Sequence, residues 1–227
     1  MIPTILFFLL KRYSRYQPAK AAKIQLLVTK TGRTVFMILL CTAFSAIASS
    51  QEKKLEYQIK RNGSVVGDIR YTQNSYGNRT KLMIESEVKT KFIFTFTAKA
   101  QEESIYDNGI MTWSFIYRKM NGNEKANKKT KAFGNSYTIF KGSKTETLNK
   151  FPIRYNMLCL YTTEPTSITQ VYSDNFEQFI AIEKTAEHKY KIELPDGNYN
   201  NYYYENGILN TIEVHHSLYS ASIQLKK

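Results

Sequence analysis

Residues 55–73, LEYQIKRNGSVVGDIRYTQ, indicate the architecture of the chain. Leu55, Tyr57 and Ile59 alternate with polar residues, which is typical of a strand with one buried face. Asn62-Gly63 follows, and this pair tolerates the positive φ angles that a two-residue hairpin turn requires. Alternation resumes after the turn. The stretch therefore predicts a β-hairpin with one apolar face.

The same pattern recurs along the rest of the chain. Strand-like runs flank each of the pairs Asn62-Gly63, Asn108-Gly109, Asn121-Gly122, Asp196-Gly197 and Asn206-Gly207. Only Ser143–Tyr161 breaks the rhythm, and one or two helical turns are expected there. The fold class is therefore all-β with minor α content. We expect roughly ten strands in a single curled antiparallel sheet or incomplete β-barrel, because so many strands do not stay flat.

An export signal is expected ahead of this sheet. Residues 30–50 read KTGRTVFMILLCTAFSAIASS, in which basic residues precede an apolar run and then small residues. This order is typical of a secretory signal peptide over 30–48, cleaved after Ala48. Cleavage would leave residues 49–227 as a single β domain in the periplasm or secreted. The alternative is a retained inner-membrane anchor, although the run is marginal for a spanning helix.

Residues 1–29 contain no acidic residue and precede this signal. They are interpreted as an extension upstream of the true start, or as a long basic leader to the signal. Contact with a membrane is expected only through an uncleaved signal segment.

The charge of the remaining chain does not favour a nucleic-acid partner. The whole chain has a net charge of +13, but seven of its 32 basic residues and none of its 19 acidic residues lie in 1–48, which leaves +6 for residues 49–227. A nucleic-acid binder would gather its basic residues on one face. The one dense cluster is Lys125, Lys128, Lys129 and Lys131, interpreted as a solvated loop or a lysine-protected edge strand.

Metal, cofactor and nucleophile motifs are weak. Cys159 lies in an apolar stretch and is expected to be a buried, unreactive thiol. His215 and His216 are adjacent, and neighbours in a strand point to opposite faces, so they are not expected to share a metal ion. Glu85 and Glu87 share a strand face, but such a pair is common on polar faces. The sequence therefore predicts no catalytic residues, no metal site and no cofactor, and hence a protein that is not an enzyme.

Three stretches carry a resemblance to a known family. EYQIKRNGSVVG (56–67), IYDNGI (105–110) and LPDGNYNNYYYENGIL (194–209) resemble a family of uncharacterised exported proteins of Gram-negative bacteria. The resemblance covers most of residues 52–225 and implies no catalytic residues. In architecture alone, the series of long strands is similar to the incomplete β-barrel of periplasmic lipoprotein carriers.

Two aromatic stripes give the remaining functional signal. The first comprises Phe92, Phe94 and Phe96, and the second Trp113, Phe115 and Tyr117; the turn at 108–109 joins their strands. They are either core packing or one continuous wall for an apolar ligand, with Phe94, Phe96, Trp113, Phe115 and Tyr117 as candidate ligand contacts. We therefore expect a non-catalytic binding or carrier protein for an apolar or lipid-like ligand. A cell-envelope structural or protein-interaction module is the alternative.

Overall fold

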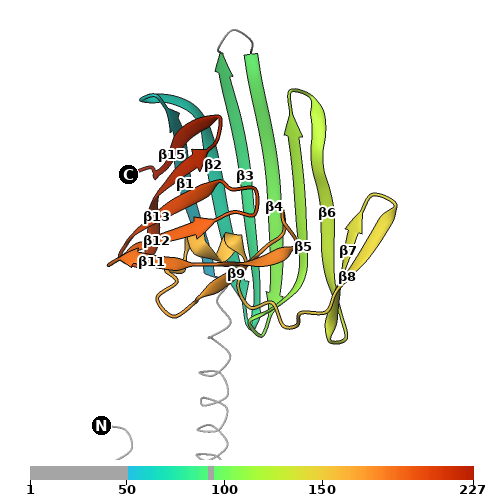
Figure 1. Ribbon diagram of the computed structural model, residues 1–227. Coiled ribbons are helices and arrows are strands. Elements are labelled where there is room, and N and C mark those ends of the chain that lie inside the picture. Colours follow the sequence, from blue (N-terminus) through green and yellow to red (C-terminus); the bar gives the residue numbers. More distant parts are fainter. Residues whose placement is uncertain (1–50, 92–94) are drawn as a thin grey trace, which may run out of the picture. The chain divides into compact units, whose positions relative to one another are not determined.

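The computed structural model describes residues 51–91 and 95–227 (Figure 1). The chain divides into a first unit, Met1–Ser49, and a second unit, Ser50–Lys227. The expected signal segment 30–48 with Ala48, the extension 1–29, and Phe92 and Phe94 lie outside the described residues. Within the two described ranges, no helix has the length and apolar character needed to span a membrane.

Fifteen strands occur in the described residues, and thirteen of them form one antiparallel sheet. The first eight are β1 (Gln51–Arg61), β2 (Ser64–Tyr76), β3 (Arg79–Lys91), β4 (Thr95–Asp107), β5 (Ile110–Met120), β6 (Asn123–Phe133), β7 (Ser136–Lys141) and β8 (Lys144–Leu148). The last five are β11 (Glu183–Ala186), β12 (Lys189–Glu193), β13 (Tyr199–Glu205), β14 (Ile208–His216) and β15 (Tyr219–Leu225).

The sheet consists of two meanders that meet where the ends of the domain pair. Strands β1 to β8 follow one another, as do β11 to β15, and β15 pairs with β1. The order runs from β11 at one edge to β8 at the other, so the sheet is not closed into a barrel. Figure 1 shows the C-terminal strands, in orange and red, curling back toward the long strands β3 to β6. The prediction of a single curled antiparallel sheet is confirmed.

The Asn-Gly turns have the geometry that the sequence predicts. Positive φ angles between 48° and 52° occur at Asn62, Asn108, Asn121 and Asn206. The glycine that follows each of them also has a positive φ. Two consecutive residues with positive φ match the right-handed twist of antiparallel strands, which is why Asn-Gly is favoured there. These four turns set the hairpins β1–β2, β4–β5, β5–β6 and β13–β14.

A connecting segment fills part of the concave face of the sheet. It contains the 3-10 helix η2 (Met157–Tyr161) and the hairpin of β9 (Gln170–Ser173) and β10 (Gln178–Ala181). The short helix agrees with the helical turns expected over Ser143–Tyr161, but β8 shows that the strand pattern continues through residues 144–148 of this stretch. We call residues 149–182 the plug.

Buried tyrosines fix the plug to the sheet. The hydroxyl of Tyr204 donates to the carbonyl of Leu160 at 2.9 Å, and the amide of Ile153 donates to the hydroxyl of Tyr137 at 2.9 Å. Aromatic residues of the sheet thus supply both apolar contact and a polar end that satisfies the irregular backbone of the plug.

The interpretation of the lysine cluster as a loop or an edge strand is wrong. Lys125, Lys128, Lys129 and Lys131 all belong to β6, which pairs with β5 on one side and β7 on the other. The edge of this meander is β8 instead. The lysines of β6 therefore do not protect an open edge.

Candidate functional site

The concave face of the sheet and the plug line a partly open cavity of about 520 Å³. Both meanders and the plug contribute to its lining. The apolar part comes mainly from β-branched residues of β1, β2, β3, β14 and β15, namely Ile59, Ile69, Ile84, Ile212, Val214 and Ile223. These residues point inward because strand side chains alternate between the two faces.

One side of the cavity is polar and charged. Arg118 on β5 and Glu102 on β4 both line it, and Nη2 of Arg118 lies 2.6 Å from Oε1 of Glu102. Burial by itself lowers the pKa of Arg118, but the adjacent carboxylate of Glu102 outweighs it and raises that pKa overall. Arg118 therefore stays charged beside the apolar wall.

Asp174 of the plug joins this polar side. Its carboxylate accepts hydrogen bonds from the hydroxyl of Ser114 and, at 3.0 Å, from the amide Nδ2 of Asn156. The same Nδ2 lies 2.6 Å from the hydroxyl of Ser104. Burial raises the pKa of Asp174 to about 6, against the lowering effect of these hydrogen bonds. Such a carboxylate disfavours its own charge and is the kind of group found at functional sites.

Cys159 lies next to this cluster and makes polar contacts there. Its Sγ is 3.3 Å from the hydroxyl of Tyr106, and burial raises the pKa of the thiol. Burial also raises the pKa of Tyr106 well above its ordinary value. Neither group is activated for nucleophilic chemistry, because a reactive cysteine has a lowered pKa.

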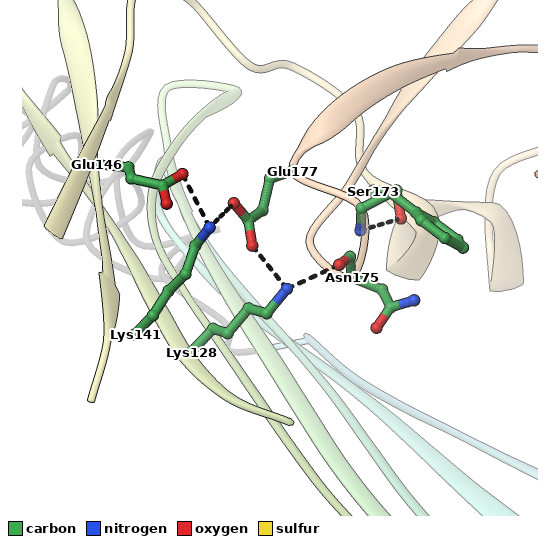
Figure 2. A network of polar contacts seen from close by, with 7 residues as sticks. Lys128, Lys141, Glu146, Ser173, Asn175 and Glu177 are labelled. Carbon is green, nitrogen blue, oxygen red and sulfur yellow. Dashed lines mark hydrogen bonds and ion pairs between the residues drawn. The ribbon is translucent and has the colours of Figure 1, made fainter. Parts of the chain in front are cut away.

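Ion pairs connect the plug to strands β6 and β7 of the first meander (Figure 2). Glu177, in the β9–β10 turn, accepts from Nζ of Lys128 at 2.6 Å and from Lys141. Lys128 also donates to the backbone carbonyl of Asn175 at 2.8 Å, and Lys141 pairs with Glu146. Because Asn175 lines the cavity, this network helps to position the cavity wall.

The structure separates Phe96 from the other described aromatic candidates. On β4 and β5, Trp113 pairs with Ile105 and Phe115 with Glu103, whereas Ala98, on the same face as Phe96, pairs with Met120. Phe96 therefore lies on the opposite face of the sheet from Trp113, Phe115 and Tyr117. The expectation of one continuous aromatic wall does not hold for these four residues, and none of them lines the cavity.

A β-bulge explains this separation. Tyr106 pairs with Met111, but Ile105 pairs with Trp113, so Thr112 is an extra residue in β5. A one-residue shift exchanges the faces of every residue that follows. The hydroxyl of Thr112 donates to the carbonyl of Ile105 at 3.3 Å and so holds the bulge. Without this bulge, Trp113 and Phe96 would share a face.

His215 and His216 lie in different surroundings. His215 stacks on Tyr199 with ring centroids 4.4 Å apart, whereas His216 stacks on Tyr219 at 4.7 Å and lines the cavity. Across residues 51–91 and 95–227, no group of three or more His, Cys, Asp or Glu side chains is arranged to hold a metal ion.

Glu85 and Glu87 lie outside the cavity and form ion pairs. Glu85 is 3.7 Å from Arg70, and Glu87 is 3.0 Å from Lys99. Both glutamates are exposed. Solvated, ion-paired carboxylates of this kind are typical of the polar face of a sheet.

Comparison with known families places the domain. Residues 57–226 match the model of a family described as a domain of unknown function, DUF6134. The chain belongs to this family. The DUF6134 domain thus covers the whole curled sheet except the start of β1, residues 51–56. This agrees with the expected resemblance to an uncharacterised β-rich family.

Two further comparisons bear on the DUF6134 domain. A search of curated proteins found no match. A solved structure from Brucella abortus, described as a β-barrel-like protein of domain of unknown function DUF1849, is similar at a TM-score of 0.49 and 12% sequence identity. The similarity covers 79% of this chain and 97% of that one.

Proposed function

We propose that the DUF6134 domain is a non-catalytic binding or carrier protein for an apolar or lipid-like ligand, held in the concave cavity. The observation that carries the proposal is the cavity itself. Its volume of about 520 Å³ lies in the range of about 300–1,000 Å³ that is typical of small-molecule sites.

The composition of the wall supports an amphiphilic ligand. Burial of apolar ligand surface against Ile84, Ile212 and Ile223 would supply most of the binding free energy, at about 25 cal/mol per Å². A few fixed polar groups then orient a ligand within such a wall. Arg118, Glu102 and Asp174 provide these groups on one side.

The expected export supports this role. If residues 30–48 act as a signal peptide, the domain works in the periplasm or outside the cell. An apolar molecule that crosses this aqueous space needs a protein that shields it from water. The catalytic alternative has less support, because the buried polar groups of the described chain include no activated nucleophile beside a base.

Titration with a fluorescent fatty-acid analogue tests the proposal. Ala100 lines the cavity, and Ala100→Phe would fill part of it without removing a hydrogen bond of its side chain. Ala186→Phe on the exposed strand β11 is the matched control. We expect Ala100→Phe to weaken binding at least tenfold and Ala186→Phe to leave it unchanged, with circular dichroism showing that both variants fold.

Equal affinity of the two variants for the analogue would contradict a site in the concave cavity. Failure of the unmodified protein to bind any chain length of the analogue would contradict a ligand of this class.

The alternative, a protein-interaction module, is favoured by one observation. Strands β8 and β11 each pair on one side only, and nearly all their residues are exposed. A free strand edge can accept another strand from a partner. Cross-linking that captures a protein at Thr145 or Lys184, in a protein that binds no analogue, would favour this alternative.

A further inference from the structure

The outer faces of the two halves of the first meander differ in charge. On β1 to β4 several outward basic residues form ion pairs with carboxylates: Arg70 pairs with Glu85, Lys99 with Glu87, and Lys81 with Glu103. On β5 to β7 the outward side chains include lysines and aromatic rings among uncharged polar residues. We call Trp113, Phe115, Lys129, Lys131 and Phe140 the lysine–aromatic face.

Strand register brings these five residues together. Trp113 pairs with Lys131, and Phe115 with Lys129, across β5 and β6; Lys129 then pairs with Phe140 across β6 and β7. The rings of Trp113 and Phe115 have centroids 6.2 Å apart, and Nζ of Lys129 lies 5.9 Å from the centroid of Phe115. Cations and rings therefore alternate over neighbouring strands.

The centre of this face carries no negative charge. The residues that point outward with it are Tyr117, Asn127, Phe133, Ser136, Thr138, Thr145 and Thr147. Two outward acids flank it. Glu103 on β4 is the cross-strand partner of Phe115 and forms an ion pair with Lys81 at 2.9 Å, and Glu124 accepts a hydrogen bond from Asn127. Within the described part of the chain, Lys129 and Lys131 have no carboxylate at ion-pair distance.

Two phenylalanines are also exposed, Phe140 on this face and Phe133 beside it. Phe133, beside the β6–β7 turn, is 78% exposed, and Phe140 is 40% exposed. These exposed rings make no hydrogen bond with water, and they lie beside lysines that have no carboxylate partner, so folding of the domain does not explain the combination. The combination of exposed rings and free cations matches the outer zone of a bilayer, which offers both apolar surface and anionic headgroups.

We propose that the lysine–aromatic face docks on an anionic phospholipid surface. Lys129 and Lys131 attract the headgroups, while Phe133, Phe140 and the edge of Trp113 enter the interfacial layer. A nucleic acid fits less well, because residues 49–227 carry a net charge of only +6. This proposal goes beyond the ligand cavity and does not depend on it, since its residues lie on the opposite face of the sheet.

Trp113 makes the test specific, because it is the one tryptophan in the whole sequence. Its fluorescence therefore reports on this face alone. The protein is titrated with vesicles of phosphatidylcholine, with and without phosphatidylglycerol, and bound protein is measured by co-sedimentation. We expect binding and a blue shift of Trp113 emission with the phosphatidylglycerol vesicles, both weakened by salt.

Two charge-reversal double variants distinguish vesicle binding through this face from vesicle binding through the rest of the chain. Lys129→Glu with Lys131→Glu should weaken binding at least tenfold and abolish the blue shift, because each lysine near an anionic surface contributes substantially to attraction. Lys184→Glu with Lys227→Glu has the same net charge and changes two exposed lysines elsewhere. Both double variants keep the same N-terminal segment, so any binding through that segment is common to them.

Loss of binding in the first double variant with retention in the second supports the proposal. Equal vesicle binding by the two double variants, or binding without a shift of Trp113, would overturn it. A shift of Trp113 with a DNA oligonucleotide but not with phosphatidylglycerol vesicles would overturn the choice of occupant. Phe133→Ser, at an exposed position, gives an independent readout and should reduce vesicle binding without reducing stability.

Discussion

Lys128 and Glu177 join the plug to the sheet through an ion pair of 2.6 Å. Both side chains are largely buried, with 21% and 15% of their surfaces exposed. Lys141 contacts the other oxygen of the same carboxylate (Figure 2). One glutamate in a tight turn therefore holds two lysines from β6 and β7 and fixes the plug at the rim of the cavity.

Glu177→Gln should lower the free energy of unfolding by about 2 kcal/mol, because it removes charged hydrogen bonds and leaves two partly buried lysines without their carboxylate. Urea denaturation measures the change. Glu146→Gln, which affects a more exposed contact of Lys141, is the control and should change stability by less than about 1 kcal/mol. Equal losses in the two variants would contradict the central role of Glu177.

The effect of Glu177→Gln should also depend on pH. Although burial raises the pKa of Glu177, its hydrogen bonds to Lys128 and Lys141 outweigh burial and lower it below the ordinary value of 4.5. The stability from ionised Glu177 is thus present above pH 4.5 and is lost as the pH falls through the lowered pKa of the folded state. The difference between wild type and Glu177→Gln should shrink in acid. A constant difference from pH 7 to pH 3 would contradict this.

Asp174 should show the opposite dependence. Its folded pKa of about 6 exceeds the ordinary 3.8, so the folded state binds the extra proton between these values. Stability from this group therefore falls as the pH rises from about 4 to 6. Asp174→Asn removes that titration, so its stability relative to wild type should improve by about 2–3 kcal/mol between pH 4 and pH 7.5. Urea denaturation at both pH values provides the comparison, and a pH-independent difference would show that Asp174 is not perturbed.

Gly67 should tolerate no side chain. A Cβ at this position would meet the backbone oxygen of Glu87 and would lie 2.9 Å from the Cα of Val88, so β2 and β3 would have to separate. Gly67→Ala should lower the free energy of unfolding by about 1–3 kcal/mol. Ser64→Ala, at an exposed position of the same strand, should change it by less than about 0.5 kcal/mol. A neutral Gly67→Ala would show that the two strands are not in close contact there.

The hairpins could be predicted from sequence because their signals are local. Asn62 and Asn108 are each followed by glycine between alternating runs, and positive φ at such a pair is a property of the residues themselves.

The sheet face of the aromatic candidates and the position of the lysines in β6 depend on contacts that are not local in the sequence. The face of Trp113 is set by the extra residue Thr112, and no residue type marks a bulge of this kind. Lys128 and Lys129 read as solvated because lysine rarely enters a sheet centre. In the fold, however, Lys128 turns inward to Glu177, which is 49 residues away along the chain, while Lys129 turns outward.

The cavity itself could not be predicted, for the same reason. Its wall combines Ile59 with Ile223, which are at opposite ends of the domain and become cross-strand partners only when β15 pairs with β1. Asp174 could not be recognised from the sequence, because a single aspartate in a turn is common. Its role depends on hydrogen bonds from Ser114 and Asn156, which only the fold brings close to it.

Native mass spectrometry of the purified protein, with lipid extraction of the same sample, tests the central claim most directly. If the concave cavity carries an apolar or lipid-like ligand, the spectrum should show protein with an added mass that matches an extracted lipid. Ala100→Phe should lose that mass while Ala186→Phe and Trp113→Ala keep it. Ligand-free wild-type protein that remains without an added mass after incubation with the extracted lipids would contradict the claim.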